Sequence, residues 1–113
     1  MVKLIEIFQL RNGSPCIVLD FLERGSLATL LQNSTMLQPE HIKNLVYQML
    51  LGIHFLHSNF IMHRDLKPDN LMLTQDGTLQ LIDFGMSKNF SDAEQMHSEG
   101  QITRVYRPPE KLF

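Results

Sequence analysis

Cysteine is scarce in this chain, because Cys16 is the only one among 113 residues. A disulfide framework within the chain is therefore excluded, and a reducing compartment is the default expectation. Cys16 begins the apolar run Cys-Ile-Val-Leu at 16–19. We therefore predict a buried thiol on a strand.

Long apolar runs are also missing. No uninterrupted stretch approaches the roughly 20 apolar residues that a membrane-spanning helix needs. Residues 2–8 mix apolar and charged side chains, so they lack the continuous apolar core and the cleavage site of a signal peptide. We expect no membrane partner and no secretory leader.

Neither sign of charge is in large excess. Ten Lys and Arg residues stand against 12 Asp and Glu residues, which gives a formal net charge of −2. Nothing in this balance points to nucleic acid or to an anionic membrane as a partner. A hydrophobic content of 43% and a charged content of 19% are typical of a soluble globular protein. We expect an intracellular location, nuclear or cytoplasmic.

The first part of the chain has the pattern of a β-hairpin. Apolar and polar residues alternate over 2–9, which predicts a strand. Residues 11–15 then read Arg-Asn-Gly-Ser-Pro, which is turn chemistry, and the apolar run 16–19 follows them. Two paired strands are therefore expected within residues 1–19.

Helical periodicity is strongest between residues 39 and 57. Apolar residues recur there at the spacing of one helix face: Ile42, Leu45, Val46, Met49, Leu50, Ile53 and Leu56. Pro39 fits the first turn of this helix. A shorter helical stretch at 27–32 precedes it, and Ser26 is the expected N-cap.

A second, shorter hairpin is expected near the middle of the chain. Apolar residues at 71–73 and 79–82 flank the turn sequence Thr-Gln-Asp-Gly-Thr. This hairpin would bring Asn70 and Asp83 to neighbouring strand ends, so that two residues distant in sequence could share a metal ion. Magnesium prefers hard oxygen ligands such as an amide and a carboxylate.

Two polar motifs border this hairpin and carry the chemistry. Residues 63–70 read His-Arg-Asp-Leu-Lys-Pro-Asp-Asn, and residues 83–85 read Asp-Phe-Gly. The pair resembles the catalytic loop and the metal-binding triplet of serine/threonine protein kinases. The resemblance is closest to cyclin-dependent kinases, especially their activating-kinase branch, and it covers essentially the whole chain.

The resemblance implies a role for each polar residue of these motifs. Asp65 would accept the proton of the substrate hydroxyl, and Lys67 would stabilise charge on the transferred phosphoryl group of ATP. Asn70 and Asp83 would hold Mg²⁺. Phe84 would pack against the histidine of the first motif, and the glycine of the triplet would free the backbone to turn.

The end of the chain resembles the end of an activation segment. Residues 103–110 read Thr-Arg-Val-Tyr-Arg-Pro-Pro-Glu, whereas the related kinases have Trp and Ala at the third and sixth positions. The resemblance implies that Thr103 positions the catalytic loop. Ser98 would be a phosphorylation site that orders the segment through Arg64 and Lys88, although an ordinary loop serine is the alternative.

The connector at 20–26 resembles the hinge that binds the adenine of ATP. The carbonyl of Asp20 and the backbone amide of Leu22 would be its hydrogen-bonding groups. Met72 would form the floor beneath the adenine ring, and its alternative is a plain core methionine.

We therefore expect an α+β, partial protein-kinase-like fold across residues 1–113. Residues 1–19 would be strands of the small lobe and 20–26 the hinge. Residues 27–82 would hold large-lobe helices, the catalytic loop and a hairpin, and 83–110 the activation segment. The Gly-rich loop and the ATP-binding lysine would lie before Met1, so the chain is expected to be truncated at both ends, with one face of its long helix partly uncovered.

These expectations define the function and its alternatives. ATP, Mg²⁺ and a protein substrate are the expected ligands, with a cyclin-like regulatory subunit in a full-length form. The chain would have little activity alone. The alternatives are a non-catalytic, pseudokinase-like docking fragment and a non-functional gene-model fragment.

Overall fold

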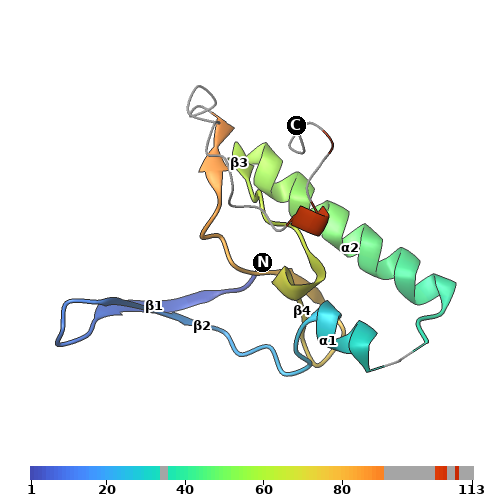
Figure 1. Cartoon of the computed structure of the whole chain (residues 1–113), viewed down its shortest axis with the longest axis horizontal. Helices are drawn as coiled ribbons and strands as arrows, with labels where there is room; N and C mark the ends of the chain where they lie inside the picture. Colours follow the sequence, from blue (N-terminus) through green and yellow to red (C-terminus); the bar gives the residue numbers. More distant parts are fainter. Residues whose placement is uncertain (34–35, 91–103, 107–108, 110–113) are drawn as a thin grey trace.

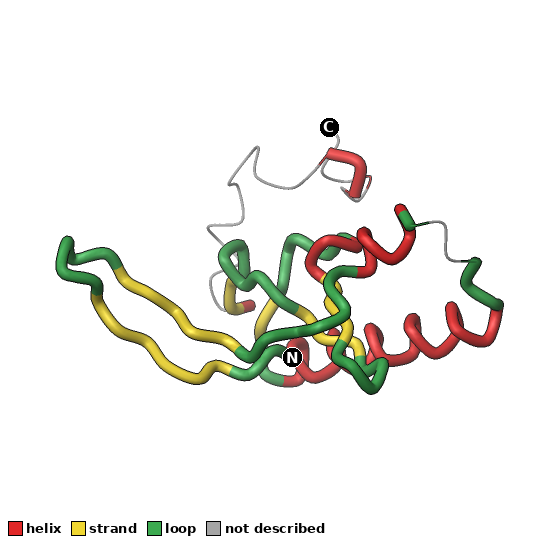
Figure 2. The backbone as a smooth tube through the Cα atoms, turned by 90° about the horizontal axis from the view of Figure 1, so that it is seen from below, coloured by secondary structure: helices red, strands yellow, loops and turns green. Residues whose placement is uncertain are grey.

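The computed structural model describes residues 1–33, 36–90, 104–106 and 109 (Figure 1). Its described part is α+β, as the sequence predicted, with the strands arranged in three separate two-stranded sheets. Strands β1 and β2 form an arm, and this arm and helix α2 extend to opposite sides of the central strands (Figure 2).

The arm is the hairpin predicted at the start of the chain. Strand β1 (Leu4–Gln9) pairs antiparallel with β2 (Pro15–Leu19). Its turn is closed by the N–H of Leu10, which donates to Ser14 O at 2.9 Å, and Gly13 supplies a backbone φ of 82°. The residues that were predicted to form a turn therefore do so.

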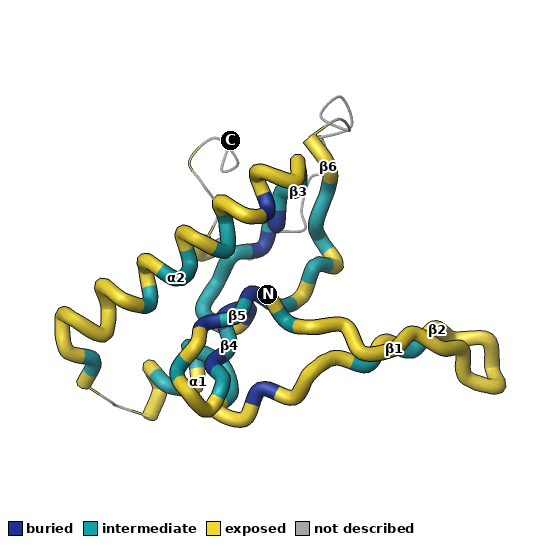
Figure 3. The backbone as a smooth tube through the Cα atoms, turned by 180° about the vertical axis from the view of Figure 1, so that it is seen from behind, coloured by how far each residue is buried: buried dark blue, intermediate teal, exposed yellow. Residues whose placement is uncertain are grey.

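The burial predicted for Cys16 is wrong, because this side chain is only half-buried. Both faces of the arm are largely open to solvent (Figure 3). Alternation along a strand identifies two faces, but burial also needs a second layer. Among the described residues the arm is joined to the body by backbone bonds such as Val2 N to Leu81 O, at 3.2 Å.

Both predicted helices are present. Helix α1 (Leu27–Gln32) is capped by Ser26, whose Oγ accepts from Thr29 N at 3.2 Å. Helix α2 (Pro39–Ser58) begins at its expected proline and ends where the side-chain amide of Asn59 donates to Phe55 O at 2.8 Å. Among the described residues, neither helix combines the length and the apolar character needed to cross a bilayer.

The second hairpin lies against α2 and forms the core. Strand β4 (Leu71–Leu73) pairs antiparallel with β5 (Leu79–Leu81), as predicted. Buried leucines from this hairpin and from the end of α2 make one cluster: Leu56, Leu71, Leu73, Leu79 and Leu81. The buried segments of Figure 3 gather in this region.

Helix α2 leaves its apolar face partly uncovered, as expected. Leu56 is its only buried residue. Ile42, Val46 and Leu50 follow the predicted periodicity, yet they remain 49%, 43% and 55% exposed. One side of this face is thus uncovered in this structure, whereas Leu45, Met49 and Leu56 pack in the core.

Three short pairings and turns were not predicted. Strand β3 (Ile61–Met62) pairs antiparallel with β6 (Lys88–Asn89), so the chain beyond the Asp-Phe-Gly triplet returns to the end of α2. The 3₁₀ turns η1 (Pro68–Asn70) and η3 (Arg104–Tyr106) are the other additions. Elements of two or three residues are too short to give a periodic signal.

Candidate active site

The hairpin β4–β5 determines where the two predicted metal ligands lie. Asn70 ends η1 immediately before β4, and Asp83 follows β5. The strands pair Leu71 with Leu81, and Ile82 N donates to Asn70 O at 3.0 Å. The backbone of Asn70 and the residue before Asp83 are therefore directly opposite at the open end of the hairpin.

A buried polar cluster is centred on Asp65. The side-chain Nδ2 of Asn70 donates to Asp65 O at 2.9 Å and to Asp65 Oδ2 at 3.0 Å. The ammonium of Lys67 lies 2.7 Å from the same Oδ2. Asp65 and Asn70 are only 7% and 5% exposed. Because Nδ2 faces Asp65, the hydrogen-bond network assigns Oδ1 of Asn70 as the atom available to a cation.

The charges in this cluster stabilise each other. Burial raises the pKa of Asp65, but hydrogen bonds from Lys67 and Asn70 and the charge of Lys67 outweigh it and leave that pKa below its ordinary value. The hydrogen bond to Asp65 raises the pKa of Lys67, and the nearby Asp69 and Asp83 add to this effect. Carboxylate and ammonium are therefore both charged at neutral pH.

His63 links the catalytic loop to the hairpin, a role that the sequence did not predict. Its Nε2 lies 2.9 Å from Ile82 O, and its Nδ1 accepts from Asp65 N at 3.3 Å. A carbonyl can only accept, so the proton sits on Nε2 and both bonds suit the neutral ring. The ring packs against Phe84, as predicted, with centroids 5.1 Å apart. The available signal in the sequence was its place at the start of the His-Arg-Asp motif.

The backbone at the site is strained at a residue other than the one expected. Asp83 has a φ of 58° and Arg64 a φ of 69°, both in the left-handed region that non-glycine residues rarely occupy. Gly85 was expected to allow the turn, but it has no positive φ. Gly85 N donates to Asp83 Oδ1 at 3.2 Å, and a Cβ on Gly85 would come within 3.2 Å of that oxygen.

The end of the connector that was predicted to bind adenine lies beside β4. Leu73 N donates to Gly25 O at 3.0 Å, and Met72 forms a β-bridge with Ser26. The connector therefore lies beside the hairpin. Leu22 is buried and Met72 is half-buried, whereas Asp20 is exposed and its N–H donates to Lys3 O.

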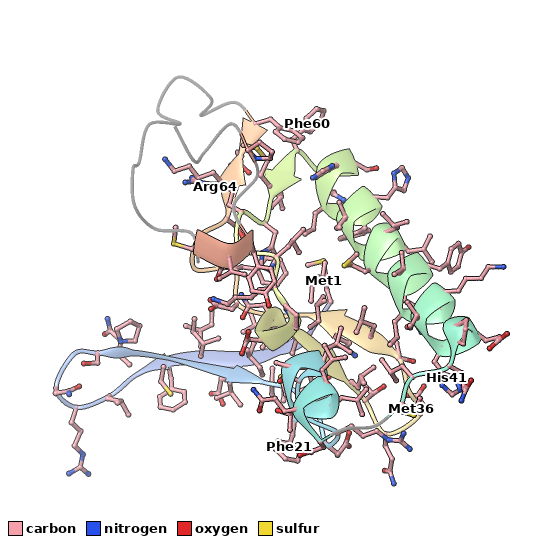
Figure 4. The ribbon with its side chains drawn as sticks, turned by 45° about the vertical axis from the view of Figure 1, so that its right-hand side comes forward. Met1, Phe21, Met36, His41, Phe60 and Arg64 are labelled. Carbon is pink, nitrogen blue, oxygen red and sulfur yellow. The ribbon has the colours of Figure 1, made fainter. Side chains whose placement is uncertain are left out.

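Lys88 and Arg64, the predicted partners of a phosphorylated Ser98, lie in and just after the unexpected β3–β6 pair. Lys88 lies opposite Met62 in that pair, two positions before Arg64. Figure 4 shows Arg64 beside β6 and away from the arm. Ser98 and Thr103, the remaining predicted site residues, lie outside the described part of the chain.

Comparison with known proteins identifies a family. Residues 1–112 match the model of the protein kinase domain. The chain is 41% identical over 110 residues to serine/threonine-protein kinase crk1 of Schizosaccharomyces pombe, which covers 97% of this chain and 32% of that protein. It is 41% identical over 97 residues to cyclin-dependent kinase 7 of Xenopus laevis, with 86% and 28% covered.

A third relative extends the comparison. Human cyclin-dependent kinase-like 5 is 37% identical over 114 residues, which cover all of this chain and 12% of that protein. The chain thus spans about a third or less of the length of these relatives.

Proposed function

We propose that this chain, which belongs to the protein kinase family, carries the phosphoryl-transfer residues of a serine/threonine kinase close to the cyclin-dependent kinases. The proposed reaction moves the terminal phosphoryl group of ATP to a protein hydroxyl, with Mg²⁺. The cluster of Asp65, Lys67 and Asn70 at the open end of the β4–β5 hairpin is the observation that carries this proposal.

Asp65 is the proposed base. Its Oδ2 already meets Lys67 and Asn70, which leaves Oδ1 as the oxygen that would accept the proton of the substrate hydroxyl. Asn70 also holds the main-chain carbonyl of Asp65, so the carboxylate is fixed relative to the hairpin. A base with a fixed position avoids the cost of ordering at the moment of reaction.

The residues at the hairpin fit a magnesium ion. Asn70 keeps Oδ1 for a cation, and the exposed Asp83 carboxylate follows the paired strand. These are hard oxygen donors of the kind that Mg²⁺ prefers, and phosphate oxygens and waters would be its other ligands. Bound Mg²⁺ would neutralise charge on the phosphates.

Lys67 is the proposed stabiliser of the transferred phosphoryl group. In this structure it pairs with Asp65, whose pKa it holds down. When its ammonium turns toward a phosphate, Asp65 loses this partner and its pKa rises. The carboxylate would then be a stronger base at the step that needs one.

The remaining parts of the proposal concern ATP and partners. The connector beside β4, with Asp20, Leu22 and Met72, would bind adenine. A protein substrate and, in a full-length form, a cyclin-like subunit are the proposed partners, and the proposed location is intracellular, nuclear or cytoplasmic. The 113-residue sequence has no Gly-rich phosphate loop, so we expect little activity from it alone.

Mg²⁺-dependent ATP binding by the purified chain tests the proposal. Asp83→Asn should abolish the Mg²⁺-dependent part of binding, whereas Asp69→Asn, the same change at an exposed residue of η1, should retain it. Circular dichroism would establish that each variant folds. A folded wild-type chain without Mg²⁺-dependent binding would refute the nucleotide site.

A non-catalytic docking role is the second candidate. The exposed apolar side chains Ile42, Val46 and Leu50 on α2 favour it. A folded chain that binds a protein partner but no nucleotide would support this role instead.

A further inference from the structure

The β4–β5 hairpin is too short to hold its own position. Each strand has three residues, and a two-stranded hairpin of this size is at best marginally stable in water. Asn70 and Asp83 border its open end. The precision of the proposed metal site therefore depends on whatever fixes the hairpin to the rest of the chain.

The outer edge of β5 begins with a donor that needs a partner. Hydrogen bonds join Asn70 to Ile82 and Thr74 to Thr78 across the hairpin, each at 3.0 Å. Bonded and non-bonded pairs alternate in an antiparallel ladder, so the pair Leu73 and Leu79 is non-bonded. The N–H of Leu79 therefore points away from β4.

Gln48 of α2 satisfies this donor. Its Oε1 accepts from Leu79 N at 2.7 Å, and its Nε2 donates to Asn44 Oδ1 at 3.2 Å and to Gly77 O at 3.5 Å. The first of these bonds is short and well placed, and Asn44 fixes the orientation of the amide. Gln48 is half-buried on the stripe of α2 that faces the hairpin.

The same stripe contacts the other end of β5. A Cβ added to Gly52 would lie 2.9 Å from Leu81 Cδ1, so the helix backbone lies close against this leucine. Helix α2 thus holds β5 at its first residue through a hydrogen bond and at its last through close packing. Asp83 follows two residues later.

We propose that Gln48 is a positioning residue for the metal site, acting through β5 on Asp83 and Asn70. This inference rests on the proposed function. Gln48 touches none of the reacting groups, and its side chain instead sets where the hairpin lies on α2. Outer-shell groups of this kind typically change metal affinity by about 10- to 100-fold when they are removed.

The test compares variants of the full chain. Gln48→Met keeps the side-chain length but removes the acceptor, and we expect Mg²⁺-dependent ATP binding to weaken about tenfold. Gln48→Glu keeps an oxygen that can accept from Leu79 N, so this variant should bind more tightly than Gln48→Met. Gln75→Met, the same change at an exposed residue of the hairpin turn, is the matched control and should bind as the wild type does.

A spectroscopic measurement separates positioning from stability. Mn²⁺ replaces Mg²⁺ and broadens NMR signals of nearby groups, so the side-chain amide of Asn70 should broaden in the wild type and less in Gln48→Met. A purely structural role would lower the melting temperature and leave this broadening unchanged in the folded variant. If Gln48→Met does not fold, Gln48→Asn withdraws the carbonyl while keeping a polar side chain.

Two failures can be told apart. Wild-type binding and broadening that persist unchanged in Gln48→Met and Gln48→Asn would overturn the positioning role alone. A folded wild type that binds no Mg²⁺ would overturn the proposed function and the inference with it.

Discussion

Replacing Asn70 with alanine tests the centre of the site most directly. The change removes both hydrogen bonds to Asp65, at 2.9 Å and 3.0 Å, in a place where Asp65 is 7% exposed. A buried carbonyl that loses its hydrogen-bond partner costs about 1–3 kcal/mol, and a hydrogen bond to a charged group contributes about 1.5–3 kcal/mol. Lys67 remains on Asp65 Oδ2, so we expect a net loss of about 2–4 kcal/mol.

The same variant changes how stability depends on pH. The folded pKa of Asp65 lies below the ordinary value of an aspartate, so its contribution to stability is present above that ordinary value and is lost as the pH falls through the folded pKa. Asn70 is one of the groups that lower this pKa. In Asn70→Ala the pKa of Asp65 should therefore rise toward its ordinary value, so the loss of stability on acidification should be smaller and should end at a higher pH.

Urea unfolding at neutral and acidic pH measures the free energy, and carboxyl NMR of Asp65 measures its pKa. Asn12→Ala is the control, because Asn12 is exposed in the turn of the arm and far along the chain from the site. A loss below about 0.5 kcal/mol together with an unchanged pKa of Asp65 would show that the Asn70 amide does not hold the carboxylate.

Three further changes give separate tests. Lys67→Met should raise the pKa of Asp65 through loss of its ion pair, and carboxyl NMR showing no rise would contradict that contact. Gln80→Met should increase the free energy of unfolding by about 1 kcal/mol, because Gln80 Oε1 is buried without a hydrogen-bond partner among the described residues. Urea unfolding measures this change, and a decrease in stability would mean that the atom is paired. Gly52→Val should cost about 1–3 kcal/mol, since its Cβ would overlap Leu81, and a melting temperature equal to wild type would mean that the helix can move away.

The sequence predicted those helices and strands whose pattern repeats several times or lies within a few neighbouring residues. Twenty residues of α2 repeat the helical period several times, and Ser26 caps α1 through a contact three residues away. The β4–β5 hairpin has a turn sequence between two apolar runs. In each case the information lies within a few residues of the element that it specifies.

Features set by distant contacts were not predictable. The left-handed φ falls on Asp83 and not on Gly85, next to the bond that joins His63 to Ile82 O across 19 residues of chain. Cys16 is only half-buried, because its strand belongs to a two-stranded arm that stands apart from the core (Figure 2). Gln48 gave one usable signal, since a polar residue stands on the same stripe as Gly52 and Leu56.

The two pairings around the site differ greatly in the length of chain that each must close. A five-residue turn separates β4 from β5, whereas the whole catalytic loop and hairpin separate β3 from β6. The entropy cost of closing a loop grows with its length. The hairpin should therefore form early in folding, and β6 should join last and open first. Amide protons of Lys88 and Asn89 would then exchange with solvent well before the bonded amides of the hairpin.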